Sequence, residues 1–330
     1  MKPEVSVVIS VKNRSALLWD CLTGLAVQTL GNDRFEVVII DNMSSEDLGA
    51  VVRRARTELG LLIRSTRTTE DRGPAPARNL GVSMAEAPII AFTDSDCRPD
   101  PAWLAIGLAA FDESDVAFAT GPVLPKLNQV AGLTSRVTFA PPVENPTFPT
   151  ANAFYRRAIF LKFGGFNPEL SFDDPFGRAT ECADTDLAWR IVDAGRQHRF
   201  VADAVMYHEV ESLGVLMWLL EPSRLFVLPE LIRRHPQLRR ELLTARLFFY
   251  PPSWLLYLGA IVVLFGLFVW PWLLALLPVL LIGRGIVRTR SVDPRVLLQF
   301  CARTLLHLPR MLVMTASLLY GSIRFRCLVL

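Results

Sequence analysis

Residues 5–15 read VSVVISVKNRS, a β-branched apolar run that ends in polar residues. A run of this length suits a buried strand and is too short for a helix. The same form recurs at residues 35–42 (FEVVIIDN) and 89–96 (IIAFTDSD), and helix-like segments fill the intervals. Strands that alternate with helices predict an α/β fold built on a doubly wound sheet.

Polar side chains collect where these strands end. Lys12 follows the first strand and Asp41 the second, while Asp94 and Asp96 follow the fourth, since residues 61–63 resemble a third strand. Ligands of such sheets bind beyond the carboxyl ends of the strands, so these residues predict a single site. Neither a glycine fingerprint nor a G-x-x-x-x-G-K-[ST] loop follows the first strand, which disfavours a dinucleotide-binding domain and a P-loop enzyme.

The tripeptide Asp94-Ser95-Asp96 is a D-x-D motif at a strand end. Two carboxylates at this spacing can bind one hard cation together. A divalent ion held there can bridge two phosphates and neutralise charge on a leaving group. Because the motif is short, a solvated acidic loop is the alternative.

The motifs also occur in a characteristic order. Four stretches follow one another along the chain: VSVVISVKNRSALLWDCLTGLAVQT, FEVVIIDNMSSED, ARNLGVSMAEAPIIAFTDSD and ADTDLAWR. Together they resemble the family-2 glycosyltransferases, which are inverting enzymes of the GT-A fold with nucleotide-sugar donors. The resemblance covers about residues 4–210. It implies a catalytic domain over residues 1–212, with a mixed α/β sheet flanked by helices.

The resemblance also assigns roles to individual residues. Asp96 is implied as the direct ligand of Mg²⁺ or Mn²⁺, with Asp94 at the metal or the ribose. His208 is a further candidate ligand, and a satisfied histidine without a metal is its alternative. The implied donor-binding residues are Ser10, Lys12, Asp41, Arg78, Asp94, Ser95 and Asn152, with the turn at residues 164–166 beside the sugar.

Asp184 matches the aspartate of the family's Glu-Asp pair, which acts as the general base. The residue before it is Ala183, so the pair is incomplete here. Asp184 and Asp186 also open a helical stretch, where one of them can act as a cap. An inverting transfer needs a base on the acceptor side and no covalent nucleophile.

The two parts of the chain differ in charge. Residues 1–212 carry 21 basic and 28 acidic side chains, whereas residues 213–330 carry 14 and 4. The chain is 51% hydrophobic, which excludes a disordered protein.

The cysteines indicate the compartment of the catalytic domain. The five cysteines are far apart and form no C-x-x-C pair, and no secretory leader precedes the first strand. We therefore expect a reducing, cytoplasmic location for the catalytic domain.

Residues 247–283 contain no charged side chain, and Trp270-Pro271-Trp272 interrupts this run. We predict a transmembrane or re-entrant hairpin over residues 248–290, which keeps the arginines on both flanks on the cytoplasmic side. A single crossing is the alternative. Amphipathic helices over residues 213–247 and 291–330 are predicted to lie along the headgroups. The polar stripe of the second comprises Arg295, Gln299, Arg303, His307 and Arg310.

These features predict a metal-dependent enzyme at the membrane. It transfers a single sugar from a nucleotide-sugar donor to a hydroxyl of a glycan or lipid-linked glycan, and membrane lipids are its other partners. A polyprenyl-phosphate glycosyl synthase is one alternative. An inactive membrane-anchored nucleotide-sugar-binding protein is another, since Ala183 departs from the pattern. Nucleic acid is not an expected partner, because the basic residues accompany leucines near the apolar run.

Overall fold

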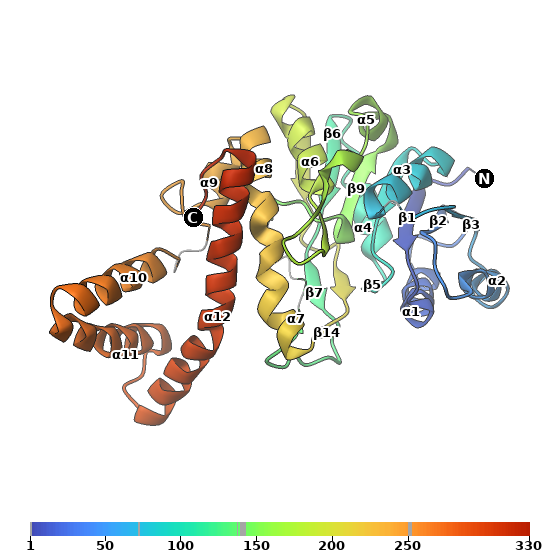
Figure 1. Ribbon diagram of the computed structural model, residues 1–330. Coiled ribbons are helices and arrows are strands. Elements are labelled where there is room, and N and C mark those ends of the chain that lie inside the picture. The colour runs from blue at the N-terminus through green and yellow to red at the C-terminus, as the bar shows by residue number, and fades with distance from the viewer. Residues whose placement is uncertain (1, 72, 137, 139–142, 250–252) are drawn as a thin grey trace. The chain divides into compact units, whose positions relative to one another are not determined.

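The computed structural model describes all residues except 1, 72, 137, 139–142 and 250–252. The chain divides into two compact units. The first comprises Met1–Phe172 and Glu181–Gly214, and the second Asp173–Thr180 and Val215–Leu330. Figure 1 shows the first unit as a sheet with flanking helices and the second as a group of helices. The chain therefore enters the second unit briefly at residues 173–180 before it returns to the first.

Within the described residues, the first unit is built on a seven-stranded sheet with the order β12-β6-β9-β4-β1-β2-β3. β1 pairs in parallel with β2 and β4, whereas β9 runs antiparallel between β4 and β6. The predicted mixed α/β sheet is confirmed. Its strands are β1 (Val5–Val11), β2 (Phe35–Asp41), β3 (Ile63–Arg67), β4 (Ile89–Phe92), β6 (Val116–Thr120), β9 (Ala153–Arg156) and β12 (Gln197–Phe200).

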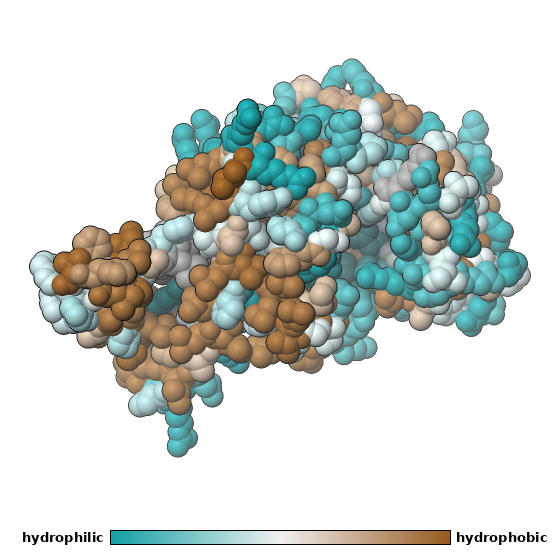
Figure 2. All heavy atoms as spheres, viewed as in Figure 1, coloured by the Kyte–Doolittle hydropathy of each residue, from teal (hydrophilic) through white to brown (hydrophobic). Residues whose placement is uncertain are grey.

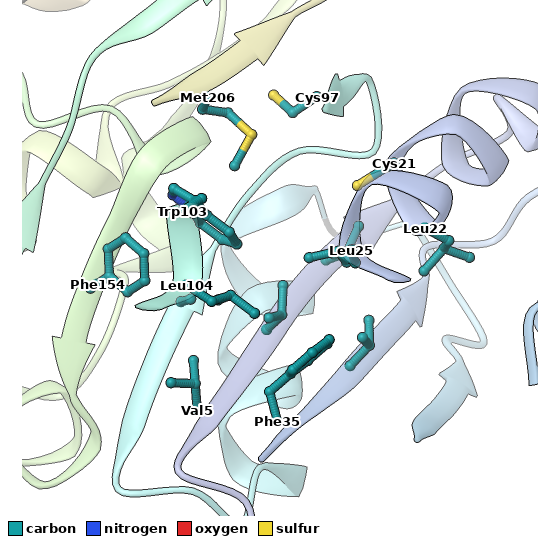
Figure 3. Close-up of a cluster of buried hydrophobic side chains, with 14 of the residues drawn as sticks. Val5, Cys21, Leu22, Leu25, Phe35, Cys97, Trp103, Leu104, Phe154 and Met206 are labelled. Atoms are coloured by element: carbon teal, nitrogen blue, oxygen red, sulfur yellow. The ribbon is translucent and has the colours of Figure 1, made fainter. Parts of the chain in front are cut away.

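The helices α1 (Ser15–Ala26) and α3 (Pro74–Met84) contact side chains of opposite parity on the central strand β1. Leu18 and Leu25 of α1 join the cluster that contains Val5, Val7 and Ile9, part of which is drawn in Figure 3. A Cβ atom added to Gly81 of α3 would lie 2.4 Å from a methyl carbon of Val8. Since successive side chains of a strand point to opposite faces, these two helices cover the two faces of the sheet. The other helices are α2 (Leu48–Glu58), α4 (Trp103–Ala109), α5 (Arg157–Lys162) and α6 (Ala183–Asp193), with short turns η1 (Thr150–Asn152) and η2 (Pro168–Leu170).

A second, three-stranded sheet positions the loop after β4. It consists of β5 (Cys97–Pro99), β13 (Met206–His208) and β7 (Val123–Pro125). β13 runs antiparallel to β5, and His208 lies directly opposite Cys97. A late strand of the first unit is thereby brought against the D-x-D motif. One short strand pair completes the first unit, β8 (Ser135–Arg136) with β14 (Glu211–Ser212). A further pair, β10 (Ser171–Asp173) with β11 (Ala179–Glu181), is divided between the two units.

The tip of the β10–β11 hairpin belongs to the second unit. Asp174 accepts hydrogen bonds from the backbone amides of Phe176 and Arg178, at 2.8 and 2.9 Å. The Arg178 guanidinium donates to the Asp174 carboxylate at 2.8 Å and also to the hydroxyl of Ser223, which in turn donates to Asp174. These bonds hold residues 173–180 within the C-terminal unit.

The second unit is helical, and its core forms between the segment at residues 215–243 and the last helix. α12 packs on η3 and α8, and a Cβ atom on Gly321 would lie 2.0 Å from the carbonyl oxygen of Phe226. Trp218, Phe226 and Leu231 are buried. Its elements are α7 (Val215–Leu220), η3 (Glu221–Val227), α8 (Leu228–Arg234), α9 (Leu238–Leu242), α10 (Ser253–Phe268), η4 (Pro271–Ala275), α11 (Leu276–Thr289) and α12 (Pro294–Phe325).

The predicted interfacial helices over residues 213–247 correspond to α7, η3, α8 and α9. Much of their apolar surface is buried inside the second unit, because the end of α12 offers it a protein partner through Met314, Leu318 and Gly321. Val215, Leu216 and Met217 at the start of α7 do remain exposed.

The predicted hairpin corresponds to α10, η4 and α11, apart from residues 250–252, which lie outside the described residues. Helices of 16 and 14 residues are about 24 and 21 Å long, shorter than the roughly 30 Å of a hydrocarbon core. Among the described residues, one helix is long and apolar enough to cross a membrane, α12. Its most apolar stretch contains no buried residue, and Figure 2 shows hydrophobic side chains gathered on this part of the surface.

Candidate active site

Four side chains that can bind a metal meet beyond the end of β4. The ligand atoms of Asp94, Asp96, Cys97 and His208 all lie within 4.8 Å of one another. Oδ1 of Asp96 is buried and accepts no hydrogen bond from any described residue. The nearest imidazole nitrogen, Nε2 of His208, lies 3.4 Å from it. A buried carboxylate oxygen without a donor beside an imidazole fits a divalent cation, and the predicted residues Asp94, Asp96 and His208 are brought together here.

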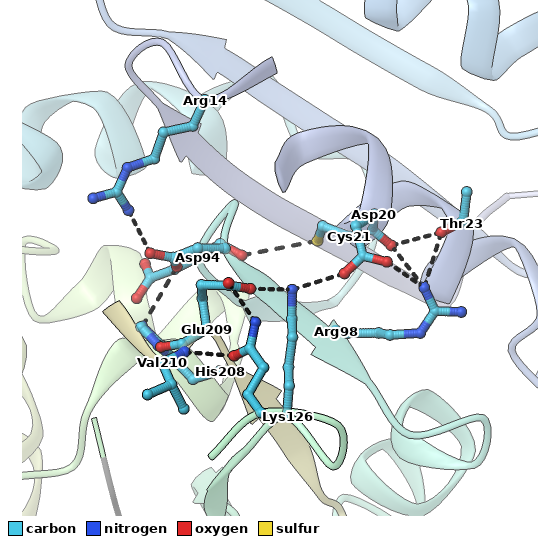
Figure 4. Close-up of polar contacts among 12 residues, drawn as sticks. Arg14, Asp20, Cys21, Thr23, Asp94, Arg98, Lys126, His208, Glu209 and Val210 are labelled. Carbon is cyan, nitrogen blue, oxygen red and sulfur yellow. Dashed lines mark hydrogen bonds and ion pairs between the residues drawn. The ribbon is translucent and has the colours of Figure 1, made fainter. Parts of the chain in front are cut away.

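The histidine is oriented by its own neighbours. Nδ1 of His208 lies 2.8 Å from the backbone oxygen of Glu209, which requires a proton on Nδ1 and leaves the lone pair of Nε2 for a ligand. The amide of Glu209 donates to the backbone oxygen of Asp96 at 3.0 Å. The ammonium group of Lys126 donates to Glu209 at 2.8 Å and to Asp20 at 2.7 Å (Figure 4). Burial alone would raise the pKa of Glu209, but the hydrogen bonds from Lys126 and Gln129 keep it below its usual range.

Two arginines balance the charge of the D-x-D motif. Nη2 of Arg78 lies 2.7 Å from Oδ1 of Asp94, and Nη1 of Arg14 binds Oδ2 of Asp96. Arg14 adopts a left-handed conformation with φ 65°, which turns the chain sharply after β1. The carboxylate of Glu46 accepts from the amides of Arg14 and Ser15, at 3.1 and 2.7 Å, and so caps α1 from the next loop. Sequence reasoning missed both Arg14 and Glu46. The only signal for Arg14 was its place in the polar turn after the first strand.

Asp184 lies in the first turn of α6, where its Oδ1 accepts from the amide of Thr185 at 2.8 Å. Burial raises the pKa of Asp184, while this hydrogen bond and the charge of Arg78 act in the opposite direction. A carboxylate with a raised pKa is a better proton acceptor than an ordinary aspartate.

Asp186 has a different role. It is 2% exposed and binds Nε of Arg190 at 2.8 Å, and Arg190 donates to the backbone oxygen of Gly165 at 2.7 Å. The second aspartate thus holds the turn at residues 164–166. Of the two, Asp184 is the one near the charged site.

Arg78 is largely buried, and three carboxylates act on its charge. Burial opposes its charge, yet the carboxylates of Asp94, Glu181 and Asp184 outweigh this effect and raise the pKa of Arg78 above its ordinary value. Glu181, on β11, accepts from the amide of Ala75 at 3.3 Å, and burial raises the pKa of Glu181. The sequence offers Glu181 only as a substitute for Asp184 as the base, together with Asp186, because it lies outside the recognisable motifs.

Four of the remaining candidates, Asp41, Lys12, Ser10 and Ser95, lie at or near the ends of the parallel strands. Asp41 lines a cavity of about 300 Å³ beside α2 and β3, and its Oδ1 accepts from the amide of Ser44 at 2.8 Å. Lys12 pairs with Asp71 at 2.5 Å. Ser10 lies on β1 beside Ile40 of β2, and Ser95 is buried within the D-x-D turn.

Asn152 is fully buried, and its amide group is occupied by protein. It accepts from the indole of Trp103 at 2.8 Å and donates to the carbonyls of Pro122 and Ala204 at 2.9 and 2.7 Å. In this arrangement Asn152 fixes β9 against its neighbours and offers no group to a sugar. The turn at residues 164–166 is likewise held by the protein, through Asn79, which bonds the backbone amide and carbonyl of Phe166 at 3.0 and 2.7 Å.

A mixed sheet with a D-x-D at a strand end, a facing histidine and an acidic residue at a helix start defines a nucleotide-sugar-dependent glycosyltransferase of the GT-A class. Residues 6–164 match the sequence model of glycosyl transferase family 2. Residues 6–164 therefore carry a domain of this family, and the protein is an enzyme, a glycosyltransferase. The alternative of an inactive binding protein is thereby set aside.

Relatives and solved structures agree with this family. The chain is 27% identical over 227 residues to the glycosyltransferase AglE of Haloferax volcanii. This alignment covers 65% of this chain and 70% of that protein. It is 26% identical to the pre-mycofactocin glycosyltransferase of Mycobacterium tuberculosis, over 62% of this chain and 43% of that protein.

Two solved structures share the fold. The mannosyltransferase PcManGT from Pyrobaculum calidifontis, solved with GDP-Man and Mn²⁺, has a TM-score of 0.59 at 20% identity and covers 99% of this chain and 88% of its own. Residues 1–349 of S. aureus TarS, solved with UDP, give a TM-score of 0.54 at 19% identity and cover 98% and 91%.

Proposed function

We propose that the protein is a metal-dependent inverting glycosyltransferase that moves one sugar from a nucleotide-sugar donor to a hydroxyl of a glycan or lipid-linked glycan at a membrane. The observation that carries this proposal is the ion pair of 2.7 Å between Arg78 and Asp94, because the pKa of the same guanidinium is also raised by the charge of Asp184. A leaving-group site and a proton acceptor thus share one edge of the sheet, as a single displacement requires.

On the donor side, Asp96 and His208, with Asp94, would hold Mg²⁺ or Mn²⁺. Such an ion would neutralise charge on the departing nucleoside diphosphate. Asp41 contacts the base from the wall of the cavity that it lines, and Arg78 adds positive charge near the phosphates. Support for a nucleotide donor comes from the fold neighbours, which were solved with GDP-Man and Mn²⁺ and with UDP.

On the acceptor side, the carboxylate of Asp184 takes the proton of the attacking hydroxyl. The oxygen then forms the new bond to the anomeric carbon from the face opposite the leaving phosphate, and the configuration inverts. Burial raises the pKa of Asp184 and so the basicity of its carboxylate, while the charge of Arg78 acts in the opposite direction.

Charge and hydropathy of the second unit support the proposed location at a membrane. Residues 213–330 carry an excess of ten positive charges, and anionic lipid attracts each at about 1 kcal/mol. The length and exposed apolar stretch of α12 suit insertion into lipid. We place the catalytic unit on the cytoplasmic side, where nucleotide sugars are made.

The experiment is a donor panel with the purified protein in lipid vesicles. A set of UDP- and GDP-sugars is offered with Mn²⁺ and with EDTA, and released nucleotide is measured for the wild type and Asp184→Asn. We expect one donor to be consumed only with metal, and Asp184→Asn to bind it normally while turnover falls by about 10² or more.

Full activity in EDTA contradicts the proposed metal dependence. Near-normal turnover of Asp184→Asn contradicts the assignment of Asp184 as the general base. Adding polyprenyl phosphate in place of a glycan acceptor tests the alternative acceptor, because a synthase of that class glycosylates the phosphate.

A further inference from the structure

The cluster at the end of β4 contains one group that the proposed transfer does not use, the thiol of Cys97. This side chain is fully buried, and it is the cross-strand partner of His208 in the β5–β13 pair. Side chains directly opposite each other in an antiparallel pair have Cβ atoms about 4.5–5.5 Å apart. The backbone register therefore holds a thiol beside an imidazole, next to two carboxylates.

We propose that Asp94, Asp96, Cys97 and His208 form a four-ligand site for thiophilic divalent cations such as Zn²⁺ and Cd²⁺, and that such an ion blocks the enzyme. The binding part stands on the side chains alone, whereas the block rests on the proposed metal-dependent transfer. The buried Oδ1 of Asp96, which accepts no hydrogen bond from any described residue, is a second observation that points to a ligand.

The donor set distinguishes two kinds of ion. Mg²⁺ prefers oxygen ligands, so it uses the carboxylates and gains little from the sulfur. Zn²⁺ and Cd²⁺ favour thiolate and imidazole, and gain most from Cys97 and His208. When the ion binds, the thiol releases its proton to solvent and the thiolate sulfur takes a coordination position.

The geometry needs only a small adjustment. Ligand atoms around a tetrahedral ion with bonds of roughly 2.0–2.3 Å lie about 3–4 Å apart, so a cluster spanning at most 4.8 Å contracts by about 1 Å. Two carboxylates and a thiolate exceed the charge of the ion by one. Arg14 and Arg78, already bound to Asp96 and Asp94, offset this excess.

A four-ligand site explains why the ion inhibits. A tetrahedral Zn²⁺ with four protein ligands has no open position, in contrast to catalytic zinc sites. Octahedral Mn²⁺ or Mg²⁺ bound by the same carboxylates and His208 retains positions for the diphosphate. The thiol thus converts an activating metal site into a closed one for the wrong ion.

Co²⁺ binding gives a readout that does not require turnover, because a Co²⁺–thiolate bond produces a charge-transfer band in the near ultraviolet. Wild type, Cys97→Ser and Cys21→Ser are titrated with Co²⁺, and Zn²⁺ affinity is measured against a chromophoric chelator. Cys21 is the matched control, since its thiol is also fully buried and lies 3.8 Å from the backbone oxygen of Asp94 without joining the cluster.

We expect the band in wild type and Cys21→Ser and its loss in Cys97→Ser, with Zn²⁺ affinity at least about tenfold weaker in that variant and Mn²⁺ affinity little changed. The proposal is overturned if the wild type shows no band, or if Cys97→Ser keeps it.

A second protein guards against misfolding of Cys97→Ser. With Cys21, Cys182, Cys301 and Cys327 all replaced by serine, Cys97 is the only thiol, and the band must persist if the assignment holds. The band is also measured in Asp184→Asn. It survives there even if no donor is ever turned over, so a failure of the proposed transfer and a failure of the thiol site are distinguishable.

Discussion

Asn152→Ala tests whether this residue is structural, as its burial indicates, or a donor contact. Its side chain makes three hydrogen bonds inside the protein, with Trp103, Pro122 and Ala204. Each contributes about 1 kcal/mol net, and the buried indole N–H and two carbonyls lose their partner together. The truncation therefore destabilises the first unit by about 3 kcal/mol.

For a unit of this size, 1 kcal/mol corresponds to roughly 2–4 °C, so the melting temperature of the full chain should fall by about 6–12 °C. Asn128→Ala is the matched control, because Asn128 is exposed. Differential scanning fluorimetry gives the melting temperature, and titration calorimetry gives donor affinity well below the melt. A variant that melts within about 2 °C of wild type but binds the donor many-fold more weakly would refute the structural role. Asn152 would then be assigned to binding of the donor sugar.

Three further predictions follow from charge and topology. Because burial raises the pKa of Asp184, the acid limb of the kcat/KM–pH profile should lie above about 3.9, the value of an ordinary aspartate, with activity falling as pH drops through it; a limb at or below that value excludes Asp184 as the base. Hydrogen bonds from Ser223 and Arg178 overcome burial and lower the pKa of Asp174 to about 2, so Asp174→Ala should lower the melting temperature near neutral pH, and the difference from wild type should shrink as pH falls from about 4 toward 2; a difference that stays constant with pH contradicts this. A single cysteine at Ser291, in a protein without the native five, should resist an impermeant thiol reagent applied to intact cells; labelling from outside replaces the hairpin with a single crossing.

The strand-end residues were predictable because the length of a strand and the pattern of its apolar residues can be recognised within a short stretch of sequence. Val5–Val11 and Ile89–Phe92 are buried runs, and the polar residues after them fall at the same edge of the sheet. The D-x-D and His208 meet because β13 pairs with β5. Their meeting followed from the family resemblance and not from any local pattern.

The contacts that sequence reasoning missed depend on register between distant loops. Glu46 caps α1 across about thirty residues, and a left-handed Arg14 turns toward Asp96. Asn152 was assigned to the donor from the family resemblance, whereas in the structure its amide group makes hydrogen bonds with three buried partners. Amphipathic periodicity in residues 213–247 marks an apolar face but does not say whether lipid or α12 covers it.

Because residues 173–180 belong to the second unit, the two units cannot be separated by a single cut in the chain. Asp174 and Arg178 depend on Ser223, which lies beyond residue 214. A cut after Gly214 would strip the hairpin tip of that partner only a few positions before Asp184, so the catalytic half cannot be excised cleanly as a stand-alone soluble fragment. For the same reason, the C-terminal region cannot simply be replaced by that of another protein. A chimera that grafts on another anchor must bring its own replacement for residues 173–180.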